Sequence, residues 1–268
     1  MAEKRRVDLT VPSAARMYDW LLDGRYHYEV DRRTGEELLR HAPTIKQLAL
    51  NNRWFLERVV RSLVEEHGIR QFIDFGSGLP TQNNVHQVAQ SVDKTSRVVY
   101  VDNDPVVMAH GLSILDENER TAILSADMTK PDDVFAHEDF TRLIDLDQPV
   151  AVLYVSVFHC VPDEAKPKEV VRSVVERLRP GSFVVLCHLV SDDEKVRRAV
   201  TDLMLEQTRG HWGRVRERHE VEEFFEGLTI HPPGLVDVTD WRPVSELQQR
   251  QRSIEITDFG GLAQVPLP

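Results

Sequence analysis

The stretch 71–80, Gln-Phe-Ile-Asp-Phe-Gly-Ser-Gly-Leu-Pro, places an acid and two glycines at the end of a short apolar run. Glycine lets the backbone turn tightly and approach a ligand closely, because no side chain stands in the way. A helical pattern over 81–90 follows, so a strand, a loop and a helix are expected in that order. Such a unit binds nucleotide cofactors through its loop. The cofactor-binding candidates are Asp74, Gly76, Ser77 and Gly78.

Two cofactor classes compete for this loop. A dinucleotide fingerprint needs the spacing G-x-G-x-x-G, and its third glycine would fall on Thr81. The acid two positions before Gly76 instead resembles the first motif of class I S-adenosylmethionine-dependent methyltransferases, which usually have a further glycine where this chain has Pro80. An ordinary tight turn is the alternative for an isolated glycine pair.

Two more acids end or follow predicted strands. Asp102 ends the apolar segment 97–102, where its carboxylate could accept hydrogen bonds from both hydroxyls of a ribose. It has no apparent partner in its local sequence. Asp127 follows the predicted strand 121–125 and could accept a hydrogen bond from an adenine amino group, with Met128 packed on the ring. A helix N-cap ahead of Pro131 is the alternative for Asp127. Asn103 joins the predicted cofactor contacts.

The run 149–157 is the most continuous apolar segment and predicts the central strand of a sheet that is covered on both faces. His159 follows the end of this strand, and the unperturbed pKa of histidine, near 6.5, suits a general base. Such a base is needed only if the acceptor loses a proton. The alternative for His159 is a hydrogen-bonded residue at a helix start. Ser156, at the same strand end, is predicted to contact the cofactor.

The residues before Thr44 lie outside the alternation of strands and helices and predict a helical cap. One helix is expected from Pro12 to Gly24 and a second over 34–40, ending before Pro43. Both are amphipathic, so their apolar faces must cover something, and we expect ligand to order the segment. The predicted contacts from the cap are Tyr18 with the cofactor, and Tyr26 and His27 with the substrate.

A long helix is predicted from Thr44 to Gly68, opened by a capping box between Thr44 and Gln47. Arg53 on this helix could bind the carboxylate of an amino-acid-like cofactor through its planar guanidinium. The alternative is that Arg53 and Asn52 form hydrogen bonds within the packing between helices.

Strands and helices alternate from residue 71 to 189, which predicts an α/β fold with a doubly wound, mostly parallel sheet. The last two predicted strands, 235–238 and 253–263, have no helix between them, so we expect an antiparallel hairpin at the sheet edge. The predicted division is a cap over 1–43 and a Rossmann-like domain over 44–268.

Composition limits the partners. The 268 residues include 33 Lys and Arg against 44 Asp and Glu, a net charge of -11, which disfavours a nucleic-acid partner. No apolar run approaches the roughly 18 residues of a membrane span, and no secretory signal is apparent. Cys160 and Cys187 are the only cysteines and have no metal-ligand spacing. We therefore expect a cytoplasmic protein that acts on a small molecule, without metal, nucleic-acid or membrane partners.

The chain resembles a family of S-adenosylmethionine-dependent methyltransferases common in actinomycetes. Gly78-Leu-Pro-Thr81 and Tyr100-Val-Asp-Asn-Asp-Pro105 are distinctive together, and the family shares the non-glycine residue at position 80. The resemblance implies a class I methyltransferase fold with a C-terminal antiparallel strand, S-adenosylmethionine as cofactor, and cofactor contacts from 74–78, Asp102 and Asp127. It leaves the acceptor open. Its matching segments are 12–24, 52–56, 75–81, 84–90 and 99–107.

The expected reaction is an in-line displacement in which the protein aligns the acceptor and excludes water. No metal is required for it. Two alternatives come from other classes: a non-catalytic, regulatory S-adenosylmethionine-binding protein, and an NAD-dependent oxidoreductase, which Thr81 and the terminal strand pair disfavour.

Overall fold

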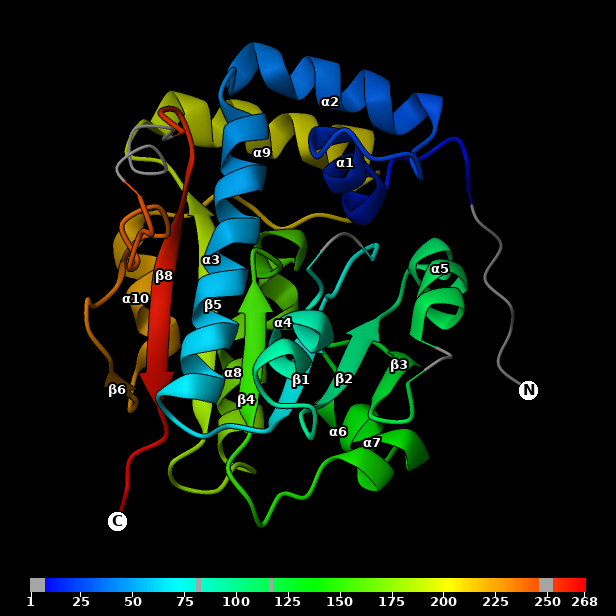
Figure 1. Cartoon of the computed structure of the whole chain (residues 1–268). Helices are drawn as coiled ribbons and strands as arrows, with labels where there is room; N and C mark the ends of the chain where they lie inside the picture. Colours follow the sequence, from blue (N-terminus) through cyan, green and yellow to red (C-terminus); the bar gives the residue numbers. More distant parts are fainter. Residues whose placement is uncertain (1–7, 81–82, 116–117, 246–252) are drawn as a thin grey trace.

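The computed structural model describes residues 8–80, 83–115, 118–245 and 253–268 (Figure 1). Thr81 and Gln82, the predicted first turn of a helix, and residues 1–7 of the predicted cap lie outside the described residues. The described strands form one sheet in the order β3-β2-β1-β4-β5-β8-β6, and β7 also pairs with β8. Their bounds are β1 Gln71–Phe75, β2 Arg97–Asp102, β3 Thr121–Ser125, β4 Ala151–Val155, β5 Phe183–Val190, β6 Thr229–Ile230, β7 Val236–Asp237 and β8 Thr257–Gln264.

The first five strands pair in parallel, and β8 runs antiparallel to β5. This confirms the predicted mostly parallel sheet with an antiparallel C-terminal strand. The α-helices of the described residues are α1 Ala14–Leu21, α2 Glu29–His41, α3 Ile45–Glu65, α4 Val85–Val92, α5 Pro105–Leu115, α6 Pro131–Phe135, α7 Glu138–Leu143, α8 Pro167–Val175, α9 Glu194–Gln207 and α10 Arg218–Glu222.

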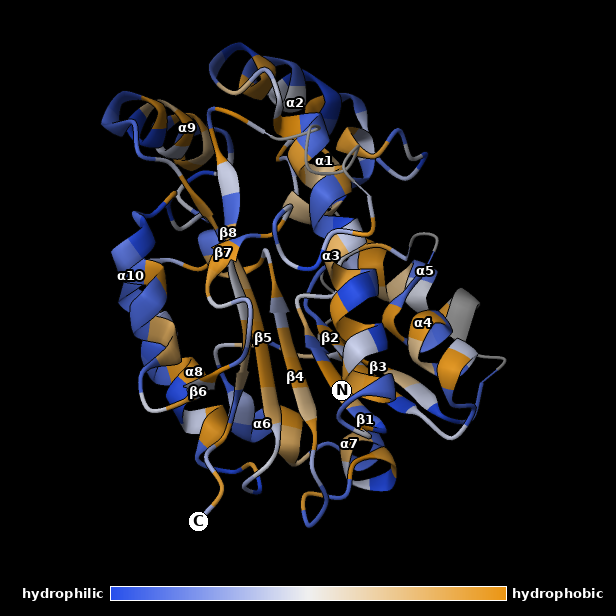
Figure 2. Cartoon of the chain, turned by 60° about the vertical axis from the view of Figure 1, so that its left-hand side comes forward, coloured by the Kyte–Doolittle hydropathy of each residue, from blue (hydrophilic) through white to orange (hydrophobic). Residues whose placement is uncertain are grey.

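Helices cover both faces of the sheet because its central strands are apolar on both sides. Ile73 and Phe75 of β1 join one core cluster with α6, α7, α8 and α10, whereas Phe72 joins a second cluster with α3 and α4. Figure 2 shows the resulting pattern, with apolar colour along β4 and β5 and hydrophilic colour on the outer surfaces of α9 and α10.

A third cluster lies beyond the carboxyl ends of β4 and β5. It joins Met17 of α1 and Leu38 of α2 to Leu48 of α3 and Met204 of α9. In Figure 1, α1, α2 and α9 lie together above the sheet. Helix α9, which is far along the chain, therefore packs against the cap, a contact that the sequence pattern did not predict.

Several predicted boundaries were wrong. The second helix begins at Glu29 rather than Thr34, and Asp31 of its first turn accepts a hydrogen bond from Tyr28 N at 2.8 Å. The expected capping box at Thr44 is not formed, because Thr44 Oγ1 donates to Glu255 Oε2 at 2.6 Å. The two predicted terminal strands do pair antiparallel, as β7 with β8, but β8 itself is not an edge strand, because it lies between β5 and the short strands β6 and β7.

Candidate active site

The loop after β1 has the open backbone that a bound cofactor requires. Gly76 and Gly78 have φ of 68° and 66°, in the left-handed region that other residues rarely adopt. A Cβ at Gly76 would lie 2.2 Å from Val157 Cγ2, so this loop packs tightly on the segment after β4. A Cβ at Gly78 would meet nothing within 4 Å, and the buried hydroxyl of Ser77 has no hydrogen-bond partner among the described residues. These features fit a ligand against the loop.

Asp102, at the end of β2, is hydrogen-bonded to the same loop. Its Oδ2 accepts from Gly78 N and its Oδ1 accepts from Asp104 N, both at 2.9 Å. The sequence suggested no local partner, and the structure corrects this. Burial raises the pKa of Asp102 to about 6, although the backbone hydrogen bonds act in the opposite direction. Asn103, the next residue, is exposed.

Asp74 and Arg53 form the inner side of this region. Asp74 is buried within β1, and burial raises its pKa to about 7, while the positive charge of Arg53 opposes that effect. Arg53 Nη2 donates to Asn83 O at 2.9 Å, so the guanidinium lies beside the segment that leads into α4. The arrangement places a cation and two acids next to the glycine loop.

Asp127 and Met128 follow β3. Asp127 Oδ1 accepts from Thr129 N at 3.0 Å and from Thr129 Oγ1 at 2.7 Å, which makes a local turn, and α6 has Lys130 rather than Asp127 as its N-cap. Met128 is buried in the core cluster with Phe75 and Val99. The adenine contacts assigned to this pair stay a prediction.

An apolar cavity of about 60 Å³ lies under the cap, and we call it the acceptor cavity. Its walls are formed by helices α1, α2, α3 and α9, by the segment after β4 and by the end of β5. The residues that line it include no Asp, Glu, Lys or Arg: Ala14, Met17, Tyr18, Leu21, Leu38, Ile45, Leu48, Ala49, Ser156, His159, Leu189, Val200, Met204 and Trp212.

The cavity brings together three residues predicted separately: Tyr18, Ser156 and His159. Tyr18 OH donates to Ala49 O and accepts from Asn52 Nδ2, both at 3.0 Å, and burial raises the pKa of Tyr18. Its hydroxyl is therefore fixed by the protein and stays protonated.

His159 lies in the single turn after β4 and is 7% exposed. Its ring is 5.0 Å from that of Trp212, and its backbone O accepts from Gly213 N at 3.0 Å. Nδ1 of His159 and Nε1 of Trp212 have no hydrogen-bond partners among the described residues. Burial, assisted by the charge of Arg216, lowers the pKa of His159 to about 3. The imidazole is neutral near pH 7.

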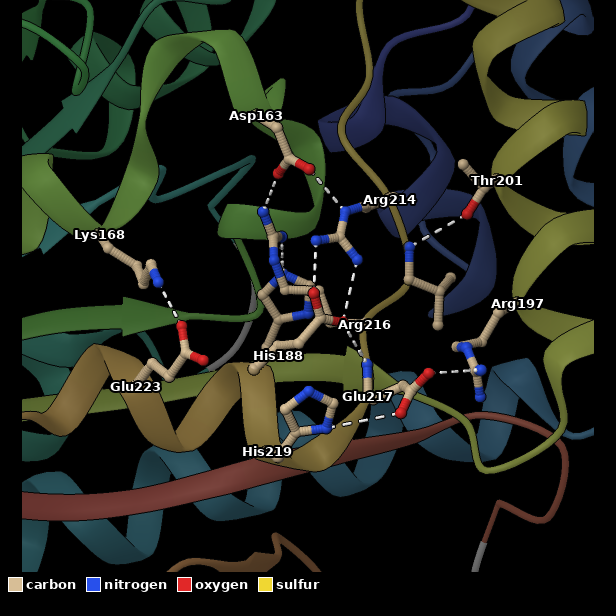
Figure 3. Close-up of polar contacts among 12 residues, drawn as sticks. Asp163, Lys168, His188, Arg197, Thr201, Arg214, Arg216, Glu217, His219 and Glu223 are labelled. Atoms are coloured by element: carbon tan, nitrogen blue, oxygen red, sulfur yellow. Dashed lines mark hydrogen bonds and ion pairs between the residues drawn. The ribbon is translucent and has the colours of Figure 1, made fainter.

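The ring of His159 lies 5.8 Å from that of His188, which belongs to a cluster of ion pairs and hydrogen bonds that holds the segments of this wall (Figure 3). His188 Nδ1 donates to Leu189 O at 2.8 Å, so its Nε2 accepts from Arg216 Nη1 at 2.6 Å. Arg216 and Arg214 both bind Asp163, which follows His159 along the chain. The buried Arg216 therefore connects β5, the turn after β4 and the loop that bears Trp212.

Asp258 in β8 was missed by the sequence reasoning. Ser156 Oγ donates to Asp258 Oδ1 at 3.0 Å, and Ser156 itself has a φ of 55°. Burial raises the pKa of Asp258 to about 7, the Ser156 hydrogen bond lowers it, and Asp237 raises it. The only sequence signal is an acid inside an otherwise apolar terminal strand. Trp212 was also missed, and nothing in its local sequence distinguishes it.

The predicted substrate contacts Tyr26 and His27 do not line the cavity. Tyr26 is 42% exposed and its ring lies 3.9 Å from that of His110 on α5. His27 Nδ1 lies 3.0 Å from Asp19 Oδ2. Tyr26 therefore contacts α5, whereas His27 contacts Asp19 of α1. Their contact with substrate stays a prediction.

The described residues include no group of three or more potential metal ligands among His, Cys, Asp and Glu. None of the described helices is both long and apolar enough to cross a membrane.

Comparisons with known proteins agree with the geometry. A family model described as S-adenosyl methyltransferase matches residues 1–266. A DUF574 family protein from Streptomyces avermitilis MA-4680 is 34% identical, with a TM-score of 0.86 over 97% of this chain and 100% of that one. A Thermobifida fusca YX protein assigned as a methyltransferase is also 34% identical, with a TM-score of 0.84 over 97% of each chain. No curated protein matches the chain.

A more distant structure shows the fold alone. The trans-methyltransferase CalH, solved with S-adenosylhomocysteine, is 14% identical and has a TM-score of 0.56 over 92% of this chain and 68% of that one. The family match and the two close structures confirm the methyltransferase fold and the cofactor, and they favour neither the oxidoreductase nor the regulatory alternative. The chain belongs to the S-adenosyl methyltransferase family and is an S-adenosylmethionine-dependent methyltransferase.

Proposed function

We propose that the methyl acceptor is a small molecule that binds in the acceptor cavity. The supporting observation is the cavity itself, a partly open space of about 60 Å³ with mainly apolar walls beneath the cap. Such a space fits a small molecule, or the reactive end of one, rather than a polymer segment. A net charge of -11 further disfavours a polyanionic acceptor.

The cofactor is proposed to lie along the glycine loop, with its ribose at Asp102. The contact of Gly76 with Val157 puts the loop beside the segment that bears Ser156 and His159, so a methyl group at the loop would be close to the cavity. The residues proposed to hold the cofactor are Tyr18, Arg53, Asp74, Gly76, Ser77, Gly78, Asp102, Asn103, Asp127, Met128 and Ser156.

S-adenosylmethionine supplies a methyl group that its positively charged sulfur activates for displacement. The protein then has to align the acceptor and exclude water. The apolar side chains of Met17, Leu48 and Met204 exclude water from the cavity. His159 is neutral and therefore places no cation near a sulfonium. As a general base His159 would be weak, because a group with a pKa of about 3 holds a proton poorly near pH 7.

The cap over 1–43 is proposed to act as a lid on the domain over 44–268. Two contacts connect it to α5 and the residue before it: Ser13 Oγ donates to Asp104, and the ring of Tyr26 lies 3.9 Å from that of His110, tilted by 40°. One contact is to Asp104, whose N donates to Asp102, where the ribose is proposed to bind, so we propose that the lid opens for the cofactor to enter. We also place the protein in the cytoplasm, since both Cys160 and Cys187 are free thiols.

The test is to incubate the protein with methyl-labelled S-adenosylmethionine and a cell extract separated into small molecules, protein and RNA. We expect label in one or more small molecules, identified by mass spectrometry. Label that appears only in the protein or RNA fraction would overturn the proposal.

Two variants on α9 localise the acceptor. Val200 lines the cavity, so Val200→Phe should fill it and abolish product formation while S-adenosylhomocysteine still binds. Val196 packs on the same cluster without lining the cavity, so Val196→Phe is the matched control for overpacking. Equal activity in the two variants would place the acceptor elsewhere.

A further inference from the structure

A buried carboxylate with one unpaired oxygen lies beside the acceptor cavity. Asp258 is 1% exposed, and its strand pairs it with Leu189, which lines the cavity. Oδ1 accepts from Ser156 Oγ at 3.0 Å, and Oδ2 has no hydrogen-bond partner among the described residues. Burying a carboxylate without full pairing is costly, so such groups are retained mainly where they have a function.

The titratable groups that interact with Asp258 are Asp237, Cys187 and Tyr18, and Tyr18 is also affected by the charge of Arg53. Asp237 on β7 raises the pKa of Asp258. The charge of Asp258 in turn raises the pKa of Cys187 on β5 and the pKa of Tyr18 on α1. No lysine or arginine of the described chain forms an ion pair with Asp258. With no cation to balance it, the carboxylate readily takes up a proton, and burial raises its pKa to about 7.

Ser156 connects this carboxylate to the cavity. It lines the cavity at the end of β4, and its hydroxyl donates to Asp258. A hydroxyl has one proton and two lone pairs, so the Ser156 oxygen can still accept a hydrogen bond from a ligand. Its φ of 55° is strained for a residue with a side chain, and such strain concentrates at functional sites.

We propose that Ser156 and Asp258 form a proton relay that removes the proton of a neutral hydroxyl group on the methyl acceptor. This inference rests on the proposed small-molecule acceptor in the cavity. A hydroxyl suits the site because the lining residues include no anion that could balance an ammonium group.

The proton and electron changes balance. The acceptor oxygen forms a bond to the methyl carbon, and the carbon–sulfur bond breaks with its electron pair left on sulfur, which becomes neutral. The acceptor proton moves to Ser156 Oγ as the Ser156 proton moves to Asp258, giving a neutral carboxylic acid that later releases the proton to water. Asp258 is thus a positioning and proton-accepting residue that acts through Ser156. His159 would offer the acceptor a neutral hydrogen-bonding group.

The first test needs no acceptor. Protein labelled with ¹³C at aspartate carboxyls is titrated by NMR with S-adenosylhomocysteine bound, and Asp258→Asn identifies the Asp258 signal. We expect a titration midpoint within about one pH unit of 7. Ser156→Ala should raise this midpoint, because it removes a hydrogen bond that stabilises the ionised form. Ser173→Ala is the control, since the Ser173 hydroxyl donates to Val170 O within α8 and has no contact with Asp258 or Asp237 among the hydrogen bonds of the described residues.

A midpoint below about pH 5, or one that Ser156→Ala does not move beyond the control, would overturn the relay. This outcome is independent of whether the proposed small-molecule acceptor is found.

The second test follows the labelled product formed from the small-molecule extract. The wild-type rate should fall as pH drops below about 7, whereas Asp258→Asn should lower the rate at least ~100-fold and remove that pH dependence. Its affinity for S-adenosylhomocysteine should stay within about twofold of wild type. A variant with the wild-type rate and pH profile would refute the relay, whereas absence of labelled small molecules with wild-type protein would refute the proposed function instead.

Discussion

Replacing Asp258 by Asn should stabilise the protein increasingly as pH rises. The carboxyl has an ordinary pKa of 3.8, and burial raises it to about 7 in the folded state. The folded protein therefore binds this proton more tightly than the unfolded chain does. The resulting stabilisation is fully present below pH 3.8 and is lost as pH rises through about 7. Asn has no charge to bury, so its contribution stays constant.

The pKa of Asp258 changes from 3.8 in the unfolded chain to about 7 in the folded protein. Each pKa unit corresponds to about 1.36 kcal/mol, so the free energy of unfolding should change by about 4 kcal/mol in all. Asp258 is 1% exposed, so solvent screening reduces this figure little. About 2 kcal/mol of the change falls between about pH 5.5 and about pH 8.5, where acid denaturation does not intervene. Contributions from the other acids cancel, because wild type and variant share them.

Urea denaturation of both proteins across that pH range measures the effect, with the free energy of unfolding extrapolated to water. Asp93→Asn is the control: hydrogen bonds from Thr95 hold the pKa of Asp93 at about 2, so it stays ionised in both states throughout this range. Its difference from wild type should not change with pH. A difference between wild type and Asp258→Asn that is equally constant would refute the reasoning about a buried, unpaired carboxylate.

Three further predictions concern the ligands. Asp102→Ala should weaken S-adenosylhomocysteine binding about 10-fold or more in calorimetry, since a charge-assisted bond contributes about 1.5 to 3 kcal/mol, and unchanged affinity in a folded variant would remove the ribose assignment. Hydrogen exchange over residues 12–30 should slow when S-adenosylhomocysteine binds, and equal exchange with and without ligand would argue against a lid. Gel-shift titrations with tRNA and duplex DNA at low salt should show no binding, because a protein of net charge -11 repels polyanions where screening is weakest; micromolar, salt-sensitive binding would contradict this.

The local sequence predicted the frame of the site. Apolar runs that end in Asp74-x-Gly76-x-Gly78 and in Asp102 were sufficient to identify β1, its glycine loop and β2, because each signal depends on adjacent residues. Helix starts were predicted less well. Thr44 matched a capping box, yet its hydroxyl bonds to Glu255, a partner 211 residues away that no local pattern reveals.

The acceptor cavity is formed only in the tertiary structure, and the local sequence did not predict it. Its walls come from α1, from the end of β4 and from α9 and Trp212, segments that the order of strands and the packing of the cap bring together. Ser156 and Asp258 are 102 residues apart and meet only because β8 inserts antiparallel beside β5, next to β4. Sequence by itself determined the strands and the glycine loop, since these follow from short-range chemistry, whereas the type of cofactor came from the family resemblance. Which polar groups share a buried cavity depends on long-range contacts, and only the folded chain determines those.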